Sequence, residues 1–233
     1  MKDAYKSIYE ALVHAGIEND ARINVVKIDS EDCAGKTAGA LAAMFKGVEG
    51  ILIPGGFGKR GVEGKIKAIE FARSNHIPFL GLCLGVQAAI IEFARHVCHM
   101  KNAHSTEFNK HTTYPVVSLL EEQKNMQAKG ATMRLGAYPC RLKKHSKSYN
   151  AYRSSIITER HRHRYEFNNL YRKIMEKKGM VFAGVSPDRR LVEIIELKNH
   201  PWFVAVQFHP EFKSKPIKAH PLFRDFIKAA LVK

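Results

Sequence analysis

The chain is short of cysteine and of long apolar runs. Its 233 residues include four irregularly spaced cysteines, Cys33, Cys83, Cys98 and Cys140. This pattern excludes a disulfide framework and a CxxC metal site, and it favours a reducing cytoplasm. No uncharged apolar stretch approaches membrane-spanning length, and the N-terminus lacks the apolar core of a signal peptide. We therefore expect a soluble, unexported protein with no membrane partner.

Acidic residues are also scarce, with 22 Asp and Glu against 38 Lys and Arg and a formal net charge of +16. A basic surface attracts phosphates without sequence preference, so nucleic acid or an acidic small molecule has to be considered. The basic residues concentrate in 134–178, most densely in 143–145 and 160–164. Such runs are more often solvated surface than binding sites. We interpret most of the cluster in this way, and nucleic acid is not the expected partner.

Short apolar segments alternate with helical patterns in the first half of the chain, and no internal repeat or low-complexity linker interrupts it. Expected strands there are 23–28, 50–54 and 77–82, and expected helices are 3–16, 36–46, 63–75 and 84–98. The second half predicts strands at 133–142, 180–185, 191–197 and 202–208, and helices at 168–178 and 221–233. This order predicts one α/β domain over residues 1–233, with an open, mostly parallel central sheet and helices on both faces.

The strongest local signal lies at 78–87, where the buried strand Pro-Phe-Leu-Gly-Leu runs through Gly-x-Cys-x-Gly into a helix. This is a nucleophile elbow with Cys83 in place of serine. The sharp turn crowds the backbone, and Gly81 and Gly85 leave room for it. A helix N-terminus also favours the thiolate form of a cysteine. Alone, the pattern fits a small buried cysteine between two packing glycines about equally well.

A second signal follows the last predicted strand, where one proline separates His209 from Glu211. A cysteine nucleophile needs a base, and the base needs an acceptor that orients it. His209 would take the thiol proton and later give it to a leaving group, while Glu211 would fix the imidazole tautomer. The alternative is an exposed His-Pro-Glu turn, and only the pairing with Cys83 favours catalysis.

A third signal is the glycine-rich segment 54–58, Pro-Gly-Gly-Phe-Gly, which directly follows another predicted strand. Ligands bind at the carboxyl edge of open α/β sheets. Glycine there lets backbone N–H groups approach a ligand, so those of Gly56 and Leu84 would form an oxyanion hole. The alternative is a plain tight turn.

These three motifs, in this order, resemble the class I (triad) glutamine amidotransferase family. Their positions are 54–58, 81–87 and 207–211. Further segments resemble the amidotransferase domain of CTP synthases within that family: 102–108, 133–136 and 159–166. The resemblance extends over nearly the whole chain.

The resemblance implies a catalytic triad of Cys83, His209 and Glu211. It also implies contacts with L-glutamine from Gly56, Leu84, Gly85, Val86, Gln87, Glu107 and Arg164. A carboxylate suits the substrate α-ammonium and a guanidinium suits its α-carboxylate. The chemistry of Glu107 and Arg164 therefore agrees with the implied contacts. The implied reaction is glutamine hydrolysis through a γ-glutamyl thioester, which supplies ammonia for ATP-dependent amination of UTP to CTP in pyrimidine nucleotide biosynthesis.

The resemblance implies neither a metal nor a cofactor in this domain. The family's complete enzyme begins with a synthetase domain that uses ATP and Mg²⁺, and this chain has no P-loop, GxxxxGK[ST]. We therefore do not expect the chain to make CTP alone. Residues 134–137 resemble the family's lid, which takes part in activation by GTP. The expected partner is the synthetase domain, in cis or in trans, with homo-oligomers only in its presence.

The family's amidotransferase domain usually starts with a strand before the helix matched by 3–16, and we expect that strand to be missing. Its absence would leave backbone groups unpaired, at about 1–3 kcal/mol for each buried group. Two alternatives therefore stay open. One is an inactive or partner-dependent fragment with an interaction role. The other is a different class I amidotransferase or a γ-glutamyl hydrolase relative, against which residues 160–166 argue.

Overall fold

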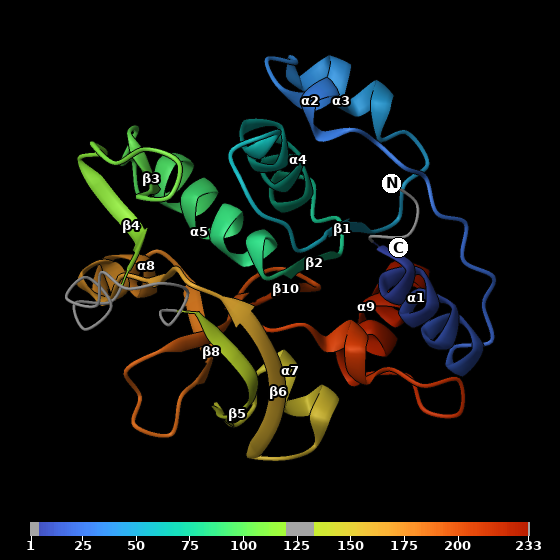
Figure 1. The fold of residues 1–233 in the computed structure, drawn as a ribbon. Coiled ribbons are helices and arrows are strands. Elements are labelled where there is room, and N and C mark those ends of the chain that lie inside the picture. The colour runs from blue at the N-terminus through green and yellow to red at the C-terminus, as the bar shows by residue number, and fades with distance from the viewer. Residues whose placement is uncertain (1–4, 120–132, 233) are drawn as a thin grey trace.

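The computed structural model describes residues 5–119 and 133–232 (Figure 1). Within these residues the main sheet has seven strands in the order β1-β2-β10-β9-β8-β5-β6. Their bounds are β1 Ile51–Ile53, β2 Phe79–Leu82, β10 Phe203–Val206, β9 Val192–Leu197, β8 Met180–Val185, β5 Arg134–Leu142 and β6 Ile156–His163. β2 pairs in parallel with β1 and β10, and each pairing from β10 to β6 is antiparallel. The α/β class is confirmed, and the parallel strands are those that precede the three motifs.

Helices cover both faces of the sheet, as predicted (Figure 1). They are α1 Lys6–Glu18, α2 Ser30–Cys33, α3 Ala38–Met44, α4 Val62–Ser74, α5 Leu84–His96, α7 Lys147–Tyr152, α8 Arg172–Lys177 and α9 Pro221–Leu231. Successive strand residues point to opposite faces. Phe79 and Phe203 therefore pack with α4 and α5 in one buried cluster, whereas Leu80 and Val204 pack with α1 and α9 in another. No helix in the described ranges is both long and apolar enough to span a membrane.

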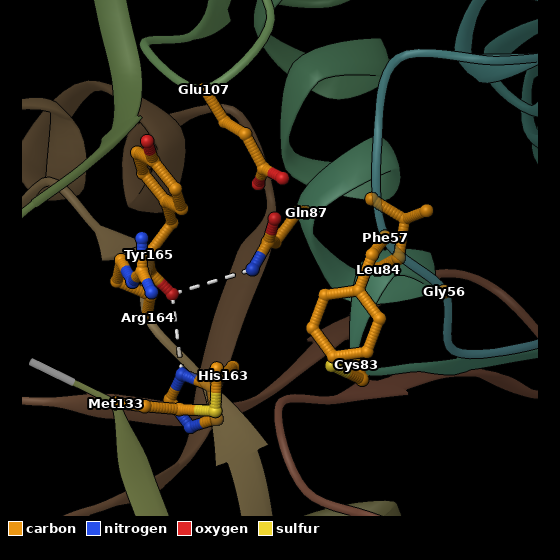
Figure 2. A pocket seen from close by; sticks show the side chains of 10 residues that line it. All are labelled: Gly56, Phe57, Cys83, Leu84, Gln87, Glu107, Met133, His163, Arg164 and Tyr165. Atoms are coloured by element: carbon orange, nitrogen blue, oxygen red, sulfur yellow. Dashed lines mark hydrogen bonds between the residues drawn. The ribbon is translucent and has the colours of Figure 1, made fainter. Parts of the chain in front are cut away.

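A small second sheet lies beside α5 and consists of β3 (Ala103–Ser105), β4 (Tyr114–Ser118) and β7 (Glu166–Phe167). β3 and β4 are parallel, and β7 is antiparallel to β4. The turn after β3 carries Glu107, whose main-chain N–H donates to the Ser105 hydroxyl. This sheet therefore holds one of the predicted glutamine contacts over the first turn of α5 (Figure 2).

The strand predicted at 23–28 is wrong. Residues 21–29 adopt no regular structure, and Val25 and Val26 are 40% and 61% exposed. Their apolar pattern suits a strand, but a strand needs a neighbour that shares its hydrogen bonds. In the described part of the chain, β1 pairs with β2 alone. The helix predicted at 168–178 consists of a 3₁₀ turn, Asn169–Tyr171, followed by α8.

The prediction missed β6, which forms one edge of the main sheet. Burial alternates along this strand: Glu159, His161 and His163 are buried, while Arg160 and Arg162 are exposed. β5 pairs with it along nearly its whole length. The densest basic run therefore includes the outward face of an edge strand, and its arginines are solvated as predicted. Because the inward face is polar as well, the sequence lacks the alternation of polar and apolar residues by which a strand is predicted.

Candidate active site

Cys83 lies in the strained turn between β2 and α5. Its φ and ψ are 50° and −98°. Residues with a side chain rarely adopt this backbone conformation, which costs about 1–3 kcal/mol of strain. Its N–H donates to the Val206 carbonyl at 2.8 Å, which ties the turn to β10. A Cβ on Gly81 would lie 2.9 Å from that of Ala205, and one on Gly85 would lie 2.5 Å from the Ile53 carbonyl oxygen. Both glycines of Gly-x-Cys-x-Gly are therefore required by close packing.

We expect Gly85→Ala to lower the free energy of unfolding by about 1–3 kcal/mol, because its methyl group would press on the Ile53 backbone. Gly39→Ala is the matched control, since Gly39 also lies in a helix but has open space where a Cβ would be. Alanine at Gly39 should stabilise the protein by up to about 1 kcal/mol. Urea unfolding compares the two variants. Equal stabilities would show that the elbow accommodates a side chain.

His209 follows β10 and lies beside Cys83. Its Nδ1 is 2.8 Å from Glu211 Oε1, and its main-chain N–H donates to the Arg160 carbonyl at 2.8 Å. A Cβ on Gly55 would lie 2.9 Å from His209 Cε1 and 3.4 Å from Cys83 Cβ, so the two side chains meet over this glycine. Glu211 is buried, and its carboxylate accepts a hydrogen bond from Nδ1–H of His209, which leaves Nε2 for the thiol.

The electrostatics favour a charged imidazole. Burial lowers the pKa of His209, but the adjacent Cys83 sulfur and the hydrogen-bonded Glu211 carboxylate outweigh burial and raise that pKa well above its ordinary value. An imidazolium beside a cysteine stabilises the thiolate. A cysteine, a histidine and a carboxylate in this order of contact have the arrangement of a catalytic triad.

Cys83 opens onto a cavity of about 150 Å³, a volume sufficient for a small organic molecule, since an engineered cavity of about this size binds benzene. Ten residues line it (Figure 2): Gly56, Phe57, Cys83, Leu84, Gln87, Glu107, Met133, His163, Arg164 and Tyr165. They come from the glycine loop, the elbow, the turn after β3, and the chain around β5, β6 and β7. The structure thus brings together segments from most of the chain.

Five of the seven predicted glutamine contacts line this cavity: Gly56, Leu84, Gln87, Glu107 and Arg164. Gly85 and Val86 are buried in α5 instead and do not line it. Any contact from these two residues would therefore have to come from the main chain. Leu84 is the first residue of α5, where a backbone N–H has no acceptor inside the helix. Leu84 and Gly56 both line the cavity together with Cys83.

The two predicted charged contacts lie on different segments of the wall. Burial raises the pKa of the Glu107 carboxyl, while the Gly58 backbone and Arg164 act in the opposite direction. Arg164 is exposed and follows β6. Glu107 is thus held in a partly dry position with a guanidinium in its neighbourhood, an arrangement that suits a zwitterionic ligand.

Sequence reasoning missed four residues of the cavity wall: Phe57, Met133, His163 and Tyr165. The Tyr165 carbonyl accepts a hydrogen bond from Gln87 Nε2 at 3.3 Å (Figure 2). His163 lies on the buried face of β6. A strand of this kind is normally recognised by alternating polar and apolar residues, but here both faces carry polar residues, so the sequence carries no such signal.

Arg134, the first basic residue of the cluster at 134–178, is not solvated. It begins β5 and forms ion pairs with Glu166 at 3.2 Å and Glu193 at 2.9 Å, both of which are buried. The prediction of a mostly solvated cluster is therefore corrected at this position. No group of three or more His, Cys, Asp or Glu side chains in residues 5–119 and 133–232 is arranged to hold a metal ion.

The family model for class I glutamine amidotransferases matches residues 1–229. The chain belongs to the class I glutamine amidotransferase family, as its motifs predicted. Its relatives include the CTP synthases of Caldanaerobacter subterraneus subsp. tengcongensis and Aquifex aeolicus, which are 57% and 54% identical over 231 residues. These alignments cover 99% of this chain and 42% of each relative. The chain therefore spans less than half the length of the curated relatives that it matches.

Solved structures agree with this assignment. The Trypanosoma brucei CTPS glutaminase domain with bound acivicin has a TM-score of 0.94 at 38% identity, covering 99% of this chain and 89% of that one. A putative GMP synthase component from Thermoplasma acidophilum has a TM-score of 0.60 at 18% identity, covering 97% of this chain and 88% of that one, and shares the fold. The predicted similarity to the amidotransferase domain of CTP synthases is confirmed.

Proposed function

We propose that this chain hydrolyses L-glutamine, with Cys83 as the nucleophile, His209 as proton carrier and Glu211 as the group that orients His209. The observation that carries the proposal is the strained Cys83 at the cavity wall with the His209–Glu211 pair beside it. Membership of the amidotransferase family supports glutamine as the substrate.

In the proposed reaction, the Cys83 thiolate attacks the side-chain amide carbon of glutamine. The N–H groups of Gly56 and Leu84 stabilise the negative oxygen of the tetrahedral intermediate. The C–N bond then breaks, His209 protonates the departing ammonia, and a γ-glutamyl thioester remains on Cys83. A water molecule gives a proton to His209 and attacks the thioester, and the C–S bond breaks. Glutamate leaves and the thiolate–imidazolium pair is restored.

The cavity wall also supports recognition of an amino acid. Glu107 would bind the α-ammonium and Arg164 the α-carboxylate, while the amide reaches Cys83. A charge-assisted hydrogen bond contributes about 1.5–3 kcal/mol. These two contacts would fix both ends of the substrate backbone, so the reacting carbon is placed by groups that take no part in the chemistry.

Glu107→Gln should raise the KM for glutamine by about tenfold to a hundredfold, because the amide keeps the shape but loses the charge that faces the ammonium. The kcat should change less. Steady-state glutamate release at several glutamine concentrations measures both. Glu176→Gln is the control, because Glu176 lies on α8, its side chain is 47% exposed, and it does not line the cavity. An unchanged KM in Glu107→Gln would remove Glu107 from the binding site.

We further propose that the ammonia serves the amination of UTP to CTP. The names of the relatives support this step, which needs a synthetase domain with ATP and Mg²⁺, in cis or in trans. GTP is the proposed activator. Residues 134–137 resemble the family's lid, but Arg134 is engaged in buried ion pairs, so any effect of GTP would act on a residue that is already anchored.

The test is an assay of glutamate and CTP. The chain is incubated with glutamine alone, and then with the synthetase domain of a related CTP synthase, UTP, ATP and Mg²⁺, with and without GTP. We expect glutamate release in all arms, and CTP when the synthetase domain is present. Ammonium salt in place of glutamine checks that domain separately. Absence of glutamate in every arm would contradict the proposal, and glutamate without CTP would remove its second step.

A further inference from the structure

The main chain of β6 contacts both His209 and Cys83. The Arg160 carbonyl accepts the main-chain N–H of His209, and the Arg162 carbonyl lies 3.8 Å from Cys83 Sγ. Between and beyond these carbonyls, the side chains of His161 and His163 point inward and are 0% and 2% exposed. The proposed reaction gives neither histidine a role. Buried polar side chains need hydrogen-bond partners, so the contacts of this pair require an explanation.

The two imidazoles form a continuous hydrogen-bonded path. His161 Nδ1 lies 2.9 Å from His163 Nε2, and His163 Nδ1 lies 3.3 Å from the Tyr165 carbonyl oxygen. The same carbonyl accepts from Gln87 Nε2 at 3.3 Å (Figure 2). Tyr165 directly follows Arg164. The path therefore ends at the backbone that carries the proposed carboxylate contact.

Only one arrangement of protons satisfies these contacts. Burial and the nearby Arg134 lower the pKa of His161 to about 2 and that of His163 to about 3, so both rings are neutral. A carbonyl can only accept, so His163 carries its proton on Nδ1. Its Nε2 must then accept from His161 Nδ1–H. His161 Nε2 is left without a proton, and it is buried with no partner among the described residues.

The charged neighbours of the pair come from four other elements. Arg134 of β5 is paired with Glu166 of β7 and Glu193 of β9. Glu193 lies 3.7 Å from His161 Nδ1, and Glu166 lies 3.5 Å from His163 Nδ1. His209 follows β10, and its positive charge also disfavours protonation of either ring. The imidazoles thus lie between a fixed ion-pair cluster and the cavity.

The ring of His161 also packs against the chain that carries the base. Its centroid is 5.7 Å from that of Phe208, which directly precedes His209, and 5.6 Å from that of Tyr138. Both contacts are edge-on, which fixes the ring plane. His163 continues from this anchored ring to the cavity wall. The pair therefore runs from the segment next to His209 to the substrate-binding segment, while His209 itself is held by Glu211 and the Arg160 carbonyl.

We propose that His161 and His163 form a positioning pair, each in the Nδ1–H form, which holds the Tyr165 carbonyl and so orders Gln87 and Arg164 for glutamine binding. The inference rests on the proposed glutaminase function. Loss of the pair acts on binding more than on bond breaking, because the reacting sulfur and His209 keep their own contacts. The KM for glutamine should therefore change more than kcat.

The kinetic test compares three variants. His163→Phe fills the ring volume without hydrogen bonds and should raise KM about tenfold, with kcat within about threefold of the parent. His163→Asn can still donate to the Tyr165 carbonyl and should restore most of the KM. His200→Phe is the matched control, because His200 is buried and bonds the Ala72 carbonyl but does not line the cavity. An unchanged KM in His163→Phe overturns the inference.

A measurement on the unmodified chain keeps the test decisive if His163→Phe fails to fold, and a binding measurement extends the test if it folds. Imidazole ¹⁵N shifts of the unmodified chain should show both histidines neutral and protonated on Nδ1 from pH 6 to 8. A ring protonated on Nε2, or one that titrates in this range, overturns the inference. In a Cys83→Ala background, His163→Asn should bind glutamine with nearly the parent Kd, and His163→Phe should bind about tenfold more weakly. Glutamate release by the unmodified chain tests the proposed function separately.

Discussion

Replacing Cys83 with alanine should lower the rate of glutamate release by about three to six orders of magnitude, as expected when the nucleophile of a triad is lost. The methyl group cannot form the thioester, so water would have to attack the bound amide directly. The oxyanion hole and the substrate contacts would remain, which is why glutamine should still bind. Glutamate measured by an enzyme-coupled assay, with glutamine binding by calorimetry, separates the two effects.

Cys98→Ala is the matched control for this prediction. Cys98 is also buried and free, and burial raises the pKa of its thiol, so it remains uncharged. It lies beyond the end of α5 and does not line the cavity. We expect normal glutamate release from Cys98→Ala. Equal rates from the Cys83→Ala variant and the parent would refute covalent catalysis by Cys83.

The half of the fold that carries the motifs could be predicted because its strands are buried on both faces. Such strands are continuous apolar runs, and β2 and β10 fit this pattern. The elbow could also be predicted, since a Cβ on Gly85 would collide with the Ile53 carbonyl. Glycine is required at this position by the tight turn itself, so the sequence alone is sufficient to indicate the strand-to-helix elbow.

The remaining parts depend on partners far away in the sequence. Residues 23–28 have the composition of a strand, but composition does not supply a neighbouring strand. β6 has the period of two, yet its buried face is polar: Glu159 accepts a hydrogen bond from Tyr152 of α7, while His161 and His163 bond each other and the Tyr165 carbonyl. Arg134 resembled part of a solvated run until Glu166 and Glu193 were placed beside it. Local pattern cannot reveal such pairings.

Replacing His209 with asparagine should slow glutamate release by at least about three orders of magnitude and should also suppress alkylation of Cys83 near neutral pH. The neighbouring Cys83 sulfur and Glu211 carboxylate outweigh burial and raise the pKa of His209, and an imidazolium stabilises a thiolate beside it. Asparagine carries no charge. An ordinary cysteine ionises near pH 8.5, so at about pH 6.5 the variant should be alkylated roughly a hundredfold more slowly than a full thiolate.

Iodoacetamide labelling across a pH series measures this effect, with peptide mapping to assign the label to Cys83. His111→Asn is the control, because His111 is exposed on a turn away from the cavity. Labelling of His209→Asn should recover as the pH rises through the ordinary cysteine range. The same labelling profile in His209→Asn and the parent would show that the thiolate does not depend on His209.

The two measurements also separate the roles of His209 and Glu211. Alkylation requires only a thiolate, whereas glutamate release also requires a proton to be delivered to the departing ammonia. Glu211→Gln removes a negative charge that helps to raise the pKa of His209. In this variant His209 should therefore lose its positive charge at a lower pH than in the parent. Turnover should then fall by more than labelling does at neutral pH, because the 2.8 Å contact that orients Nδ1 is weakened. An equal loss in both would mean that Glu211 acts through charge alone.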